Sequence, residues 1–250
     1  GLDDTIVVTR SNKRANIFNQ GIRNMVLDRE EELESGDMLM IVKNNYYWME
    51  EERKKIKERQ LSEERKVKSG KFNTLANHTV QSNEVSSHEI PAFLANGDRA
   101  KVMKVSRRIE LYGFHFATLL LKFPDYNNYE LEATVLLDTL TSEASALTHD
   151  QQEQLFHKIE EDYQDIPLKA DRMKAIRQDP YFNALQVKFA YAVTCHKAQG
   201  GQWSHVYVDQ GYMTDEMLTP DYIHWLYTAF TRATEMLYLV NWPKTQVEGE

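Results

Sequence analysis

A polar, glycine-containing stretch near the C-terminus has the residue types expected of a phosphate or nucleic-acid contact. It covers residues 194–202, with the sequence TCHKAQGGQ, and follows an alternating strand pattern. Paired glycines allow a backbone to approach a ligand closely, and α/β sheets bind ligands beyond the carboxyl ends of their strands. The stretch is therefore a candidate ligand-binding turn. The alternative is an ordinary strand-to-helix turn whose polar side chains are solvated.

A second stretch, residues 227–233 with the sequence YTAFTRA, carries one arginine on a predicted helix. Arg232 lies off the apolar face and shares a stripe with Trp225 and Thr228 at helical spacing. An arginine held on a rigid element can stabilise charge that develops on a transferred phosphoryl group. The alternative is an arginine in the last turn that complements the helix dipole.

The elements around these two stretches predict an α/β domain. Residues 5–9, 206–208 and 236–240 are apolar strand runs, and residues 187–193 alternate as a further strand. Ser11 can cap a first helix, and Thr219 with Pro220 can begin a second. Continuous apolar strands joined by helices indicate a parallel sheet covered on both faces. The helical spacing predicts two buried faces, one formed by Ala15, Phe18, Ile22, Met25 and Val26, and the other by Ile223, Leu226, Tyr227 and Phe230.

The middle of the chain differs from its two ends in its pattern of short strands, turns and charged residues. We interpret residues 30–182 as an insertion that separates residues 1–29 from residues 183–250. A small β-barrel is expected over about 36–48 and 88–140, with strands at 114–120 and 131–137 and a tight hairpin turn at Asn96-Gly97. Residues 49–71 are nearly all charged, which indicates an exposed helix or disorder. A helical return is expected over 148–182, beginning with the capping box of Thr148 and Gln151.

The amino-acid composition is typical of a globular protein and excludes several other classes. The chain has 250 residues, a net charge of -8 and 42% hydrophobic residues, which are ordinary values for a globular protein. No apolar run approaches the roughly 20 residues that span a membrane. The one cysteine, Cys195, excludes internal disulfides and cysteine-cluster zinc sites and suits a reducing cytoplasm. No metal-ligand spacing is found at His78, His88, His149 or His157.

Taken together, these stretches resemble a known family. Residues 196–200, HKAQG, resemble motif V of superfamily 1 helicases in the form used by the RecD and Dda branch (1B), which includes the exonuclease V alpha-subunit. Residues 227–233 resemble motif VI, and residues 9–13, with Asn19 and Arg23, resemble motif IV. The segments 36–37, 44–46 and 96–98 resemble the opening of the SH3-like barrel that this branch inserts into its second RecA-like motor domain.

The resemblance implies an ATP-dependent DNA helicase and assigns roles to individual residues. Arg232 would be the catalytic arginine that reaches the terminal phosphate, with Gly200, Gln202 and Gln199 on the nucleotide side. Single-stranded DNA would contact Thr194, His196, Lys197, Asn12 and Lys13, although Lys197 and Gln199 could serve either ligand. Stacking on bases by Tyr46, Tyr47 and Trp48 is a further hypothesis, and the alternative is that these aromatics form the barrel core.

One departure from the family limits what this chain can do alone. No G-x-x-x-x-G-K-[ST] phosphate loop occurs, and the one Gly-Lys pair, Gly70-Lys71, precedes Phe72. ATP and Mg²⁺ would thus be held mainly by an N-terminal RecA-like domain of the same polypeptide, and the fragment alone is expected to be inactive. The resemblance further implies 5′ to 3′ movement, action at duplex junctions and subunits of recombination or repair complexes.

Two other classes of protein remain open from the sequence. A non-motor module could keep a degenerate RecA-like fold and bind nucleic acid or a regulatory partner without needing Arg232. A scaffold built on the barrel and the charged segment would leave the two motif-like stretches as coincidences. A missing phosphate loop in the full gene would favour the non-motor module.

Overall fold

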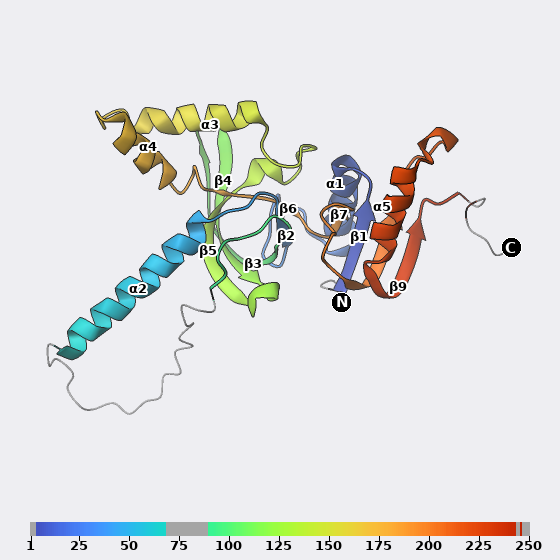
Figure 1. The fold of residues 1–250 in the computed structure, drawn as a ribbon, viewed down its shortest axis with the longest axis horizontal. Coiled ribbons are helices and arrows are strands. Elements are labelled where there is room, and N and C mark those ends of the chain that lie inside the picture. The colour runs from blue at the N-terminus through green and yellow to red at the C-terminus, as the bar shows by residue number, and fades with distance from the viewer. Residues whose placement is uncertain (1–3, 69–89, 244–245, 247–250) are drawn as a thin grey trace.

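The computed structural model describes residues 4–68, 90–243 and 246. Within them the chain forms a four-stranded parallel sheet and a closed five-stranded barrel, which lie next to each other (Figure 1). The α/β class and the expected barrel are therefore confirmed. His78, His88, the Gly70-Lys71 pair and the last part of the charged segment, residues 69–71, lie outside the described residues.

The parallel sheet has the strand order β7-β1-β8-β9. Its strands are β7 (Ala192–Thr194), β1 (Thr5–Thr9), β8 (Trp203–Asp209) and β9 (Ala233–Val240), and all three strand pairs are parallel. Helix α1 (Asn12–Gly21) packs on the face of Val7, whereas α5 (Pro220–Phe230) packs on the face of Ile6 and Val8. Because neighbouring strand residues point to opposite faces, the two helices cover opposite sides of the sheet.

Helix α1 begins at the predicted cap, Ser11, but ends before Met25 and Val26, which were predicted to lie on its buried face. The Ser11 hydroxyl caps it by accepting from the backbone N–H of Arg14 at 3.2 Å. After Gly21 the chain continues as a π-helical turn over Ile22–Val26. This wider turn changes the angular spacing of the side chains, so Arg23 is buried while Met25 is 84% exposed and Val26 is 68% exposed. The prediction that Met25 and Val26 extend the buried face was wrong.

The buried face of α5 is also rotated from the predicted one. Tyr222 and Ala229 are buried, whereas Ile223 is 64% and Tyr227 is 72% exposed. Apolar residues surround most of this helix, so helical spacing could not identify the side that meets the sheet. Thr219 occupies the N-cap position without a side-chain cap hydrogen bond, and Pro220 opens the helix as predicted.

The barrel closes in the order β2-β3-β4-β5-β6. Its strands are β2 (Met38–Ile41), β3 (Arg99–Leu111), β4 (Phe114–Phe123), β5 (Tyr129–Leu136) and β6 (Leu185–Phe189). The strands expected at 114–120 and 131–137 are confirmed as β4 and β5. Asn96-Gly97 forms a turn, with Gly97 at φ +110. This turn precedes β3 and does not join two strands directly, because it lies at the end of the long connection, residues 42–98, between β2 and β3.

One predicted strand is divided between the two parts of the molecule. Residues 187–193 were expected to be a single strand of the parallel sheet, whereas β6 pairs with β2 and β5 in the barrel and β7 pairs with β1. The chain crosses at Ala190 and Tyr191, whose side chains are buried. Residues 185–189 therefore close the barrel, which differs from the prediction that residues 183–250 all belong to the parallel-sheet domain.

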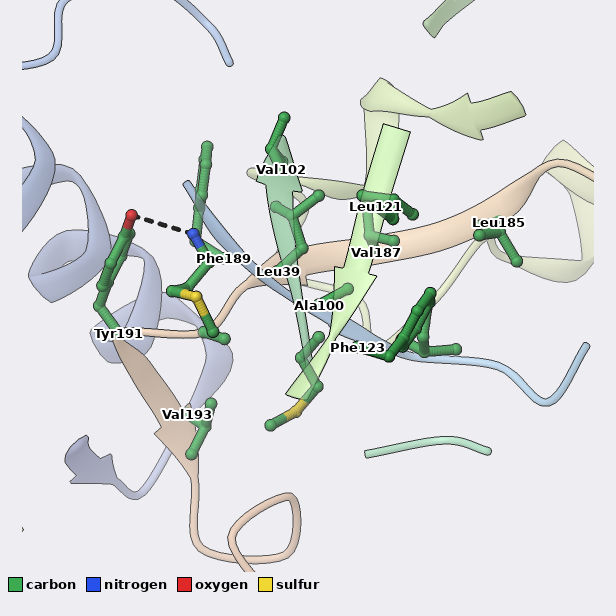
Figure 2. Packing of buried hydrophobic residues seen from close by; sticks show 14 of the residues in the cluster. Leu39, Ala100, Val102, Leu121, Phe123, Leu185, Val187, Phe189, Tyr191 and Val193 are labelled. Carbon is green, nitrogen blue, oxygen red and sulfur yellow. Dashed lines mark hydrogen bonds between the residues drawn. The ribbon is translucent and has the colours of Figure 1, made fainter. Parts of the chain in front are cut away.

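The two parts share one hydrophobic core. The same buried cluster contains Leu39, Val102 and Leu121 from the barrel and Val193 and Val208 from the sheet. Figure 2 shows residues of this cluster from both parts, including Leu185 of the barrel and Val193 of the sheet. The Tyr191 hydroxyl accepts from the backbone N–H of Met38 at 3.0 Å, which is the dashed bond of Figure 2.

A buried carboxylate ties together the two places where the chain passes between barrel and sheet. Asp37 is 0% exposed and accepts from Arg23 Nε and Nη2 at 3.1 Å each, from Arg29 Nη1 at 2.7 Å and from the Tyr191 hydroxyl at 2.9 Å. The Arg23 guanidinium also lies 4.4 Å from the Phe189 ring centroid. Arg23, in the π-helical turn after α1, therefore helps to hold the barrel against the parallel sheet.

Three helices flank the barrel. Helix α2 (Tyr47–Lys68) projects away from it and contains most of the charged segment (Figure 1). Helices α3 (His149–Asp162) and α4 (Lys169–Arg177) form the expected helical return, and the capping box of Thr148 and Gln151 is confirmed. Short 3-10 turns occupy Pro124–Tyr126, Leu137–Thr139 and Asp215–Met217. Among the described residues, no helix combines the length and apolar character needed to cross a membrane.

Candidate functional site

The candidate site lies where the parallel strands end. Thr9 closes β1 and Thr194 closes β7, and the two residues are paired in the sheet register. The backbone N–H of Cys195 donates to Thr9 O at 3.1 Å. The chain segments that follow, beginning with Arg10 and Cys195, therefore leave the same edge of the sheet. This edge is where parallel α/β sheets place ligand-binding residues.

The turn over residues 194–202 has a buried inner side and an exposed outer side. Thr194 O accepts from the backbone N–H groups of Lys197 at 2.9 Å and Ala198 at 3.1 Å. Cys195 and Ala198 are buried, which anchors the turn in the core. The outer side presents the residues predicted to face ligands, namely His196, Gln199, Gly200 and Gln202, all of which are exposed.

The two glycines of the turn serve different purposes. Gly200 has φ +85, a backbone conformation in which a side chain is strained, although a Cβ there would meet nothing within 4 Å. A Cβ on Gly201 would lie 3.0 Å or less from three ring carbons of Trp203. Gly201 is therefore required by the packing of Trp203, whereas Gly200 is required by the path of the backbone.

Arg232 joins the two motif-like stretches. It lies beyond the last residue of α5, which ends at Phe230, and not within the helix as the spacing predicted. Its Nη1 donates to Gly201 O at 3.1 Å, its Nε to Thr228 O at 3.0 Å and its Nη2 to Thr231 Oγ1 at 3.0 Å. The backbone N–H of Trp203 also donates to Arg232 O at 2.9 Å. The guanidinium is thus held in a fixed orientation beside the glycine turn.

Arg232 affects the only thiol of the chain. Burial raises the pKa of Cys195 to about 11, and the charge of Arg232 opposes that rise in pKa. The Sγ atom of Cys195 lies 3.6 Å from Trp225 O. Cys195 therefore acts as a packing residue between β7 and α5 and not as an activated nucleophile.

Sequence reasoning did not single out Arg10, although it occupies this edge. Its guanidinium lies 5.7 Å from the Tyr222 ring centroid and 5.9 Å from that of Trp225, two rings of α5 that stack on each other. It also contacts the Met213 sulfur. Its position directly after β1 was the available signal, since residues at that point face the ligand side of a parallel sheet.

The residues predicted to contact DNA are only partly brought together. Asn12, Thr194 and Lys197 line one narrow crevice between α1 and the turn, whereas Lys13 is exposed outside it. Asn12 Nδ2 donates to Glu143 O at 3.0 Å, and Lys197 Nζ contacts Asn96 Oδ1. Asn12 and Lys197 therefore also hold the inserted segment against the sheet.

The aromatic stretch at the start of α2 divides between core and surface. Trp48 is 8% exposed, and its Nε1 donates to Asn183 O at 2.9 Å. Tyr47 donates its hydroxyl to Gln178 O at 3.0 Å. Tyr46 is 53% exposed and stacks on Phe93 with ring centroids 4.8 Å apart. Trp48 therefore belongs to the barrel core, which agrees with the alternative hypothesis, whereas Tyr47 is partly buried and Tyr46 is exposed.

The carboxylate of Asp209 lies at this edge, and side chains of the protein already hydrogen-bond to it. Asp209 ends β8, is 1% exposed and accepts from Arg14 Nε at 2.8 Å and Nη2 at 2.6 Å. Asn241 Nδ2 donates to the same carboxylate at 2.6 Å. Within the part of the chain that the structure describes, no three histidine, cysteine, aspartate or glutamate side chains gather as a metal site.

Comparison with known proteins gives a match over the C-terminal segment. Residues 189–240, which contain the glycine turn and Arg232, match the family described as the UvrD-like helicase C-terminal domain. Among solved structures, the Pif1 helicase from Candida albicans is similar at 12% identity and a TM-score of 0.42, over 99% of this chain. The chain spans 47% of that structure, and no curated protein matches the sequence. The family match covers this C-terminal segment alone, and it supports a similarity of residues 189–240 to the C-terminal part of superfamily 1 helicases.

Proposed function

We propose that this chain is the second motor half of an ATP-dependent DNA helicase of the RecD and Dda branch. In this proposal the parallel sheet is the RecA-like domain and the closed barrel is its SH3-like insertion. The observation that carries the proposal is the hydrogen bond between Arg232 and Gly201. It joins the two motif-like stretches, residues 194–202 and 227–233, at the ligand-binding edge of the sheet.

Arg232 is proposed as the catalytic residue. Arginine has five N–H donors, and within the described residues three are used for Thr228, Gly201 and Thr231. Two donors remain for an anionic ligand, and their direction is fixed by the other three. A fixed guanidinium stabilises charge on a transferred phosphoryl group without reorganising.

Bound ATP with Mg²⁺ would supply the phosphoanhydride whose hydrolysis drives the motor. On this chain, the exposed Gly200, Gln199 and Gln202 would face the nucleotide from the same turn that holds Arg232. The turn's other end carries Thr194, His196 and Lys197, proposed to contact single-stranded DNA together with Asn12 and Lys13. One rigid turn would thus transmit movement between the nucleotide and the strand.

The sequence has no phosphate loop, so the phosphates and Mg²⁺ require residues outside this chain segment. We therefore propose an N-terminal RecA-like domain of the same polypeptide as the principal partner and expect residues 1–250 alone to be inactive. By resemblance, the full protein would move 5′ to 3′, open duplex junctions in the cytoplasm and work with recombination or repair subunits.

The test is the ATPase activity of the full-length protein with and without single-stranded DNA. Arg232→Ala should lower DNA-stimulated turnover by about 10³-fold or more and leave DNA binding intact. Arg107→Ala, which removes an exposed arginine of β3, serves as the matched control and should keep wild-type turnover. A full-length protein without ATPase activity on any nucleic acid would reject the motor and favour a non-motor binding module.

A further inference from the structure

A cavity of about 250 Å³ lies beside the barrel, between strand β6, the start of α2 and helix α3. Its lining comes from residues 43–47, from positions 147, 152 and 155, and from residues 182–186. We call it the insertion cavity. Its lining residues lie outside the two motif-like stretches, 194–202 and 227–233, so the chemistry proposed above for the motor leaves the cavity unexplained.

Gln186 is a buried polar residue of the insertion cavity. It is 8% exposed and points away from the barrel core, because its neighbours Leu185 and Val187 point into it. Its Oε1 accepts from the backbone N–H of Leu147 at 2.9 Å. Its Nε2 has no hydrogen-bond partner among the described residues, although buried polar groups ordinarily have one. The Gln186 amide therefore presents a donor that a ligand in the cavity would satisfy.

Two further side chains bring donors to the same cavity. Lys43 Nζ donates to Gln152 Oε1 at 3.1 Å, and an ammonium group has three donors, so two remain. Asn44 Oδ1 accepts from the backbone N–H of Asn96 at 2.7 Å, whereas Asn44 Nδ2 has no partner in the part of the chain that the structure describes. Among the described lining residues there is no carboxylate. The cavity thus favours a ligand that carries acceptor oxygens.

Aromatic rings supply the apolar part of the insertion cavity. Tyr46 is 53% exposed and stacks on Phe93 with ring centroids 4.8 Å apart. Tyr47 is held by the bond from its hydroxyl to Gln178 O at 3.0 Å, and Phe182 is 37% exposed. Rings that are held in place and partly accessible, next to hydrogen-bond donors, suit the stacking and edge recognition of an unpaired nucleobase.

The size of the insertion cavity favours a small planar ligand. Sites for drug-sized ligands occupy roughly 300–1,000 Å³, and this cavity has a volume of about 250 Å³. A single pyrimidine ring therefore suits it better than a larger group. Thymine also carries carbonyl oxygens that accept hydrogen bonds, whereas adenine carries none.

The insertion cavity is close to the turn that is proposed to contact DNA. Lys197 Nζ contacts Asn96 Oδ1, and the backbone N–H of Asn96 donates to Asn44 of the cavity at 2.7 Å. One residue, Asn96, therefore connects the turn after β7 to the cavity lining. A strand bound at that turn can present a neighbouring base to the cavity.

We propose that the insertion cavity binds one unstacked pyrimidine base of the DNA strand. Gln186 and Asn44 donate to its carbonyl oxygens, and Tyr46 stacks on its ring. The inference rests on the proposed function, because the strand is the one proposed to contact the turn after β7. It adds a base-reading site in the insertion to the contacts at the edge of the sheet, and it gives the protein a preference for thymine over adenine.

The experiment uses the full-length protein with variants of the insertion cavity. Gln186→Glu keeps the oxygen that accepts from Leu147 and replaces the free donor with an acceptor. Gln154→Glu is the matched control, because Gln154 is an exposed residue of α3 outside the cavity and gains the same charge. Tyr46→Ala removes an exposed ring and serves as the second variant if thermal unfolding shows that Gln186→Glu does not fold. Tyr46→Phe keeps the ring.

Binding of fluorescent oligothymidylate and oligoadenylate of equal length is then measured. The wild type and Gln154→Glu should prefer oligothymidylate. Gln186→Glu should raise the Kd for oligothymidylate about tenfold and leave that for oligoadenylate nearly unchanged. Tyr46→Ala should also raise the Kd for oligothymidylate about tenfold, whereas Tyr46→Phe should not. A wild type without preference, or unchanged Kd values in the folded variants, would overturn the proposal.

A photo-crosslink then locates the base. Oligothymidylate that carries one 5-iodouracil should crosslink to Tyr46 or Phe182, as mass spectrometry of the peptides shows, and Gln186→Glu should lose this crosslink while Gln154→Glu keeps it. If DNA stimulates the ATPase but crosslinks only to the edge of the sheet, the insertion cavity is not a base site and the proposed function stands. If no oligonucleotide binds or stimulates the ATPase, the proposed function fails and the base site fails with it.

Discussion

The guanidinium of Arg232 donates to the carbonyl oxygen of Gly201 at 3.1 Å, across 31 positions of the sequence. The bond links the end of α5 to the turn that follows β7. Because Gly201 is also packed against Trp203, a shift of this turn changes the orientation of Arg232. The residue proposed for catalysis and the turn proposed to contact DNA are therefore mechanically connected, and in the proposed motor this connection would let DNA binding stimulate ATP hydrolysis.

Substitutions of the two adjacent glycines should separate packing from backbone strain. Gly201→Ala places a Cβ against the Trp203 ring, so we expect it to lower the free energy of unfolding by about 1–3 kcal/mol and to reduce DNA-stimulated ATPase activity. Gly200→Ala meets open space at a positive φ and should cost about 1 kcal/mol. Urea unfolding and ATPase assays check both. A Gly201→Ala variant that is as stable as the wild type would contradict the packing role assigned to Trp203.

The buried carboxylate between barrel and sheet should be essential for stability. Asp37→Asn leaves the cations of Arg23 and Arg29 without their counter-charge, and breaking a buried ion pair in this way costs about 3–5 kcal/mol. Glu31→Gln is the control, because its pair with Arg108 is exposed and should contribute at most about 1 kcal/mol. Denaturant unfolding compares the two losses, and a similar small loss in both would refute the locking role of Asp37.

The thiol of Cys195 should be unreactive and should make stability pH-dependent. Because the pKa of the folded thiol is about 11 and that of an unfolded thiol is about 8.5, the unfolded state releases its proton first as pH rises. The contribution of this thiol to stability is therefore complete below about pH 8.5 and declines as pH rises toward 11. A thiol reagent at pH 8 should modify the protein only in urea, and Cys195→Ala should lose this part of the decline. Rapid modification of the folded protein would contradict the burial of Cys195.

Local patterns in the sequence were sufficient to predict several elements and the turn that carries the candidate site. The strand at 5–9, the cap at Ser11, the capping box at Thr148 and the turn at 194–202 each depend on residues close together in the chain. The structure then shows that Thr9 and Thr194 end neighbouring parallel strands, so the residues that follow them share one edge. Such features follow from backbone preferences and side-chain periodicity, which a sequence displays directly.

The tertiary structure decided which partner each apolar surface meets. Residues 187–193 alternate regularly, yet Phe189 belongs to the barrel and Val193 to the parallel sheet, because strand pairing depends on chain segments far away in the sequence. Contacts between distant segments also explain why Arg23 and Lys188 are buried, although charged side chains ordinarily lie at the surface. By itself the sequence determined several helices and strands and the polar turn over residues 194–202. Long-range packing alone determined that Arg232 meets Gly201 and that Lys188 lies beside Lys197.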